Sequence, residues 1–81
     1  MSHVPHELAE EFPDAIALMS RLKVEAPHFA KLADEYHEVN RKIHRAETNV
    51  QPCSEEHEQM LRRQRMRLKD EIAGVLARAE A

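Results

Sequence analysis

Two segments of this chain carry apolar side chains at alternating spacings of three and four residues, which is the spacing of one helical face. In the first segment, about residues 27–47, the stripe consists of Phe29, Leu32, Tyr36, Val39, Ile43 and Ala46. In the second, about residues 54–79, it consists of Leu61, Leu68, Ile72, Val75 and Ala79, with Arg65 interrupting the pattern. Each predicted helix must cover its stripe with another apolar surface, because exposed contiguous apolar area is unfavourable in water.

The linker between these segments, residues 48–53, contains Pro52 and favours a loop over a helix. Ser54 is a good N-cap, and Glu55 and Glu56 place negative charge in the following first turn, where the helix dipole favours it. A connection this short between two long amphipathic helices folds them back on each other. The sequence therefore predicts an all-α fold built on an antiparallel, coiled-coil-like two-helix hairpin.

The two stripes match in one register, which places Tyr36 beside Leu68 and Val39 beside Arg65. The same register sets Glu35 opposite Lys69, and we expect an ion pair there. The Arg65 stem is expected to pack beside Val39 while its guanidinium reaches Glu38 or solvent. Alternatively, Arg65 specifies register or partner choice, as a single polar seam residue can do in coiled coils.

A short helix over about residues 13–23 is expected before the hairpin. Ile16, Met19 and Leu22 recur every three positions, and Pro13 suits a first helical turn. Pro27 disfavours the α conformation for Ala26, so we expect a break or kink there, with a continuous kinked helix as the alternative. The whole chain, residues 1–81, is expected to form one domain.

Several apolar residues lie off the two stripes. A chain of 81 residues buries a smaller fraction of its surface than a larger chain does, so we expect these residues either to fold over the hairpin or to contact a second copy. The expected interaction surface, in a homo-oligomer or with another protein, consists of Phe12, Ile16, Met19, Leu22 and Leu76. A single cysteine, Cys53, fits a reducing compartment, and the N-terminal residues lack a signal-like apolar run, so a cytoplasmic protein without a membrane partner is expected.

Catalytic, cofactor and metal signatures are missing from the sequence. One glycine is too few for a phosphate-binding loop, and neither His57-Glu58 nor His6-Glu7 continues into a zinc-protease motif. His3 with His6, or Cys53 with His57, supply two ligands where a structural zinc needs four. We therefore expect no enzyme, no cofactor and no metal site.

The alternative function is nucleic-acid association through a basic run in the last predicted helix. Arg62, Arg65 and Lys69 fall on one flank, and Arg41 and Arg45 of the preceding helix would enlarge the patch. The formal net charge of −3 and the lack of tryptophan argue against this function, because neither bulk attraction nor a stacking platform supports it.

Several residues in a fixed order also suggest a family. They are Leu22-Lys23, Pro27, Phe29, Leu32, Tyr36, Ile43, Glu47 and, after the polar loop, Leu68-Lys69-Asp70-Glu71-Ile72. This order resembles the YdcH-like family of small bacterial proteins, a domain of unknown function (465), over about residues 6–77. The resemblance implies a helical hairpin in a bacterial cytoplasm, and it implies no reaction, cofactor or catalytic residue.

Overall fold

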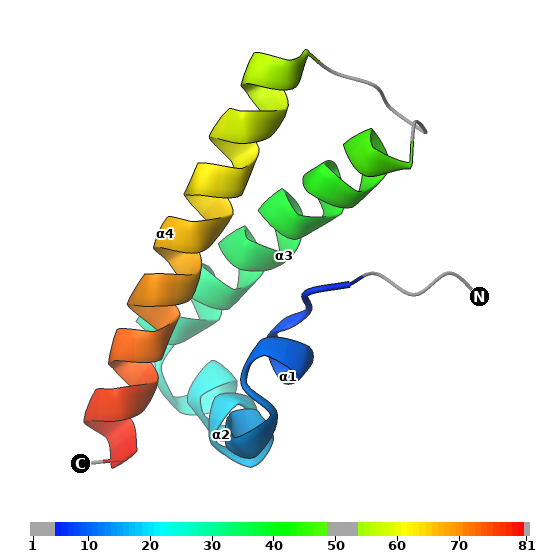
Figure 1. Cartoon of the computed structure of the whole chain (residues 1–81). Helices are drawn as coiled ribbons and strands as arrows, with labels where there is room; N and C mark the ends of the chain where they lie inside the picture. Colours follow the sequence, from blue (N-terminus) through cyan, green and yellow to red (C-terminus); the bar gives the residue numbers. More distant parts are fainter. Residues whose placement is uncertain (1–4, 49–53, 81) are drawn as a thin grey trace.

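The computed structural model describes residues 5–48 and 54–80, and all regular secondary structure within these ranges is helical (Figure 1). The elements in chain order are α1 (Leu8–Glu11), a 3-10 turn η1 (Pro13–Ala15), α2 (Ile16–Glu25), α3 (Pro27–Glu47) and α4 (Glu55–Glu80). The helix predicted over residues 13–23 is thus η1 followed by α2. The two hairpin helices begin and end within one residue of their predicted bounds. Most of the predicted loop, residues 49–53, lies outside the described residues.

Local sequence signals explain where the two long helices begin. Ala26 is extended (φ −123°, ψ 98°) and Pro27 occupies the first turn of α3. The helix is therefore interrupted before Pro27 and does not continue as one kinked helix. At α4, the backbone N–H of His57 donates to Ser54 Oγ at 3.1 Å, which confirms Ser54 as the N-cap.

Helices α3 and α4 pack antiparallel along the predicted stripes, and the hairpin prediction is confirmed. The buried stripe residues are Phe29, Leu32, Tyr36, Val39 and Ile43 of α3 and Leu61, Leu68 and Ile72 of α4. Ala46 and Val75 are half-buried, whereas Ala79 is exposed, so its assignment to the stripe is wrong. In the predicted register Ala79 lies opposite Glu25, which precedes α3, so α3 does not cover it.

The N-terminal elements pack on their own hairpin, which answers the question that the sequence left open. Figure 1 shows α1 and α2 beside the end of the hairpin that holds the start of α3 and the end of α4. Leu8, Ala15 and Met19 are buried in the common core, and Phe12 and Leu22 pack against it half-buried. The N-terminal elements therefore supply the additional apolar cover that a bare hairpin lacks.

Candidate functional site

A polar contact set fastens the N-terminal segment, residues 5–11, to α3. Tyr36 Oη donates a hydrogen bond to the His6 carbonyl at 2.6 Å, and Asn40 Nδ2 donates to the Pro5 carbonyl at 2.9 Å. Nδ1 of His37 lies 2.9 Å from Glu7 Oε2, an ion pair when the ring is protonated. His6 has a φ of 64°, a backbone conformation that residues other than glycine rarely adopt. The two hydrogen bonds to neighbouring carbonyls hold the backbone in this strained turn.

Tyr36 is fully buried, and its environment changes its acidity. The pKa of the phenol is raised from 10.0 to about 12, mainly because burial disfavours the charged form and next because the Glu11 carboxylate lies nearby. Arg65 acts in the opposite direction, and Glu7 adds a smaller increase to this pKa. The hydroxyl is therefore held in the protonated state in which it donates to the His6 carbonyl.

The environment of Arg65 differs from the prediction. Its Nη1 donates to Asn40 Oδ1 at 2.9 Å instead of to Glu38, and the side chain is half-buried. This bond joins α4 to α3. Asn40 directly follows Val39, the predicted neighbour of Arg65, so the bond agrees with the predicted register. The burial of Asn40 was not predicted, because a polar residue is expected on the solvent side of a helix. Its position four residues after Tyr36, on the edge of the stripe, is the signal that indicates burial.

One flank of α4 faces the N-terminal segment, and we call Arg62, Arg65, Met66 and Lys69 its inner flank. Lys69 Nζ lies 3.5 Å from Glu11 Oε1, so the expected pairing of Lys69 with Glu35 is wrong. The reason is tertiary, because residues 5–11 fold in beside α4 and bring the Glu11 carboxylate to Lys69. Arg62 Nη2 pairs with Glu47 Oε2 at 2.9 Å and with Glu58 Oε1 at 3.1 Å.

An open cleft of about 300 Å³ follows the inner flank, lined by its four residues together with His6, Glu11 and Tyr36. The structure thus brings together Arg62, Arg65 and Lys69 of the predicted basic patch. Arg41 and Arg45 of that patch lie on α3 and do not line this cleft. Each of the three cations in the cleft already contacts an acceptor of the same chain, which lowers the positive potential available to a phosphate.

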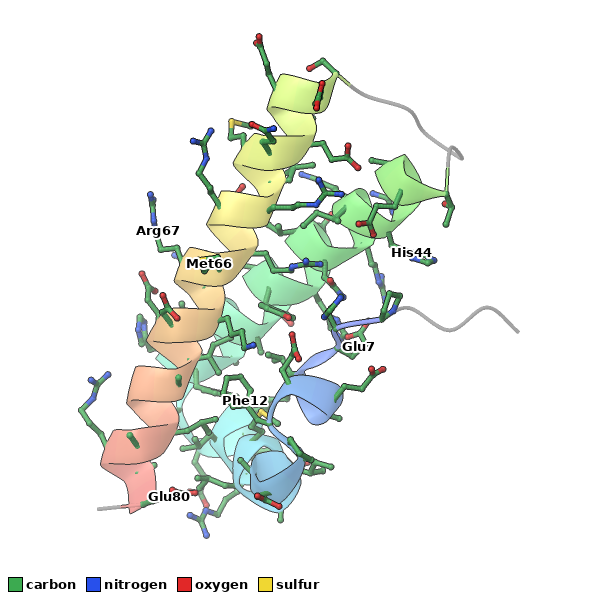
Figure 2. All side chains as sticks on the ribbon, viewed as in Figure 1. Glu7, Phe12, His44, Met66, Arg67 and Glu80 are labelled. Carbon is green, nitrogen blue, oxygen red and sulfur yellow. The ribbon has the colours of Figure 1, made fainter. Side chains whose placement is uncertain are left out.

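The opposite flank of α4 is open to solvent, and we call Glu56, Met60, Arg63, Arg67, Glu71, Gly74 and Arg78 its outer flank. Met60, Arg63 and Arg67 line a shallow surface hollow with Gln64. Figure 2 shows Arg67 directed away from α3. Met60 is 48% exposed, and all the charged residues of this flank are exposed. Within residues 5–48 and 54–80, none of these charged residues forms an ion pair.

The predicted interaction surface is largely used inside the chain. Met19 and Leu76 are buried, Phe12 and Leu22 are half-buried, and Ile16 alone is exposed, at 49%. The first four of these residues lie in the common core or pack against it because the N-terminal elements fold over the hairpin, whereas Ile16 lies outside it. A contact between two chains through all five stays a prediction, and it requires α1 and α2 to leave the hairpin.

Two other features concern metals and membranes. No group of three or more His, Cys, Asp or Glu side chains is arranged to hold a metal among the residues that the structure describes, and His3 and Cys53 lie outside them. None of the described helices is both long and apolar enough to cross a bilayer.

These observations define a small helical-hairpin protein whose N-terminal helices fold back onto the hairpin. The chain belongs to the DUF465 family, because the model of the family described as "Protein of unknown function (DUF465)" matches residues 29–76. The resemblance noted from the sequence is thereby confirmed. The matched region contains most of α3 and most of α4, including Met60 to Gly74 of the outer flank. Comparisons with curated proteins and with solved structures give no match.

Proposed function

We propose that this chain is a protein-interaction module of the cytoplasm that self-associates through the outer flank of α4. The supporting observation is the contrast between the two flanks of this helix. On the inner flank the cations are engaged within the chain, whereas on the outer flank Arg63, Arg67 and Glu71 are exposed and form no ion pair with another described residue. Methionine and arginine, which this flank carries, are enriched in protein interfaces.

Catalysis is not part of the proposal. Within the described residues the inner-flank cleft is open to water, and its carboxylate, Glu11, contacts both His6 and Lys69. An active site needs a water-excluding pocket with an acid or base available for the substrate. The inner-flank cleft meets neither requirement, and we propose neither a reaction nor a cofactor.

Nucleic-acid binding is the competing function, through Arg62, Arg65 and Lys69 with Arg41 and Arg45. A phosphate in the cleft would have to displace acceptors that already contact these side chains, such as Glu47 beside Arg62 and Asn40 beside Arg65. This cost favours self-association as the function of α4.

Sedimentation equilibrium across the micromolar range tests the proposal, with a matched pair of variants on one helix. Met60 on the outer flank is 48% exposed and Met66 on the inner flank is 65% exposed. We expect the wild-type chain to dimerise with increasing concentration, Met60→Glu to weaken the dimer, and Met66→Glu to leave it unchanged. A chain that stays monomeric throughout refutes the proposal.

A parallel measurement distinguishes nucleic-acid binding from self-association. Fluorescence anisotropy with a labelled DNA duplex and a labelled single strand at low salt is expected to show no binding. Binding that is lost in Arg62→Ala and Arg65→Ala, in a chain that does not self-associate, would instead support nucleic-acid association.

A further inference from the structure

The outer flank of α4 carries an ordered sequence of charges. From its first to its last residue it is acidic at Glu56, basic at Arg63 and Arg67, acidic at Glu71 and basic at Arg78. Spacings of three and four residues between successive flank positions keep them on one side of the helix. Since these charges lack ion-pair partners within the described chain, the pattern is available to a second molecule.

We infer that the occupant of this flank is the same flank of a second copy, packed antiparallel about a two-fold axis at Arg67. Positions equally distant from Arg67 then face each other. Arg63 lies opposite the partner's Glu71, and Glu56 lies opposite the partner's Arg78. A two-fold axis repeats each contact, so every flank charge other than Arg67 meets its opposite. The inference rests on the proposed self-association and specifies its orientation and register.

Gly74 supplies a second observation, independent of charge. Within a helix a glycine is less favourable than an alanine, because it loses more conformational freedom on folding. The backbone of Gly74 does not have a positive φ, and a Cβ placed there would meet only the Arg78 guanidinium, 3.5 Å from Nη1. Neither conformation nor packing within the chain requires a glycine at this position. In the inferred dimer Gly74 faces the partner's Met60, and the missing side chain leaves room for the thioether and for close approach of the helices.

The axis itself holds a pair of like charges, Arg67 and the partner's Arg67. Their methylene stems can pack across the axis while each guanidinium reaches the partner's Glu71, one helical turn away. One helix face per subunit is a small interface, so we expect a dimer of modest affinity that weakens with salt.

Charge reversal at one contact tests the register. Arg63→Glu and Glu71→Arg each place like charges opposite one another at two symmetric sites, and we expect each variant alone to raise the dimer dissociation constant about tenfold. An equimolar mixture of the two variants restores both contacts in a heterodimer. The double variant R63E/E71R restores them in a homodimer, so dimerisation should recover in both cases.

A control separates specific pairing from a general effect of net charge. Asp34 is an exposed acidic residue of α3, away from the outer flank. The double variant R63E/D34R has the same net charge as R63E/E71R, but it leaves the introduced glutamate opposite the partner's Glu71 at both symmetric sites, so its dimerisation should not recover. Far-ultraviolet circular dichroism of each variant verifies that the helices are intact.

The outcomes are distinct. A wild-type chain that is monomeric at all concentrations overturns both the proposed function and the register. Persistence of a wild-type-like dimer in Arg63→Glu and Glu71→Arg overturns the register alone. Equal recovery in R63E/E71R and R63E/D34R also overturns the register, because restoring the net charge would then be sufficient.

Discussion

Raising the pH of a solution of the folded protein should leave Tyr36 protonated beyond the point at which an ordinary tyrosine ionises. The phenol is 0% exposed, and its hydroxyl donates to the His6 carbonyl at 2.6 Å. A tyrosinate cannot donate this bond, and it would place a charge in the core beside the Glu11 carboxylate. We expect an apparent pKa of about 12 for Tyr36 instead of 10.0.

The size of the effect on stability follows from this difference in pKa. A pKa difference of one between the folded and unfolded states corresponds to about 1.4 kcal/mol, so the rise from 10.0 to about 12 corresponds to roughly 3 kcal/mol of stability. Because the folded-state pKa lies above the unfolded value, this stabilisation is complete below about pH 10 and is lost as the pH rises through about 12. The free energy of unfolding should fall over this interval.

The assay is direct because Tyr36 is the only tyrosine and the chain has no tryptophan. Tyrosinate absorbance in the near ultraviolet reports its ionisation, and far-ultraviolet circular dichroism recorded in parallel reports whether the helices persist. The urea-unfolded chain is the control and should titrate near pH 10. Ionisation near pH 10 with helical content unchanged would refute the burial of Tyr36 and its bond to the N-terminal segment.

Three further predictions concern unfolding in urea, measured by circular dichroism at a concentration that keeps the chain monomeric. Gly74→Ala should stabilise the monomer by up to about 1 kcal/mol while weakening self-association, and a stronger dimer would contradict the inferred helix contact. Asn40→Ala should cost about 1–3 kcal/mol, because Arg65 and the Pro5 carbonyl lose their partner; a neutral result would show that water replaces both bonds. Ile72→Ala, at a fully buried site, should cost about 2–5 kcal/mol, whereas Met66→Ala should change stability by less than about 0.5 kcal/mol; similar values for both would exclude the described core.

The hairpin was predictable because its determinants are local. The stripe from Phe29 to Ile43 follows the periodicity of a single helix, Pro27 restricts the conformation of Ala26, and Ser54 caps the helix that follows it. None of these effects depends on residues far along the chain. The family resemblance depends on the same segments, which the family model matches over residues 29–76.

The placement of the N-terminal segment depended on the tertiary structure. The sequence marked Met19 and Leu76 as apolar residues without a partner, but it could not say whether their partner would be the same chain or another, because apolar burial has no directional preference. Polar pairs are decided in the same way. Lys69 contacts Glu11 instead of Glu35, and Asn40 becomes a buried link between Pro5 and Arg65, only because residues 5–11 return to the hairpin.

The amino-acid sequence by itself thus determined the helices, the antiparallel hairpin and the residues of its apolar seam, since helical periodicity and capping act over a few neighbouring positions. Only the tertiary structure decided which charges of α4 are engaged within the chain and which are left on its outer flank. That division arises from contacts between residues far apart in the chain, such as Glu11 with Lys69 and Glu47 with Arg62, and no local pattern encodes such contacts.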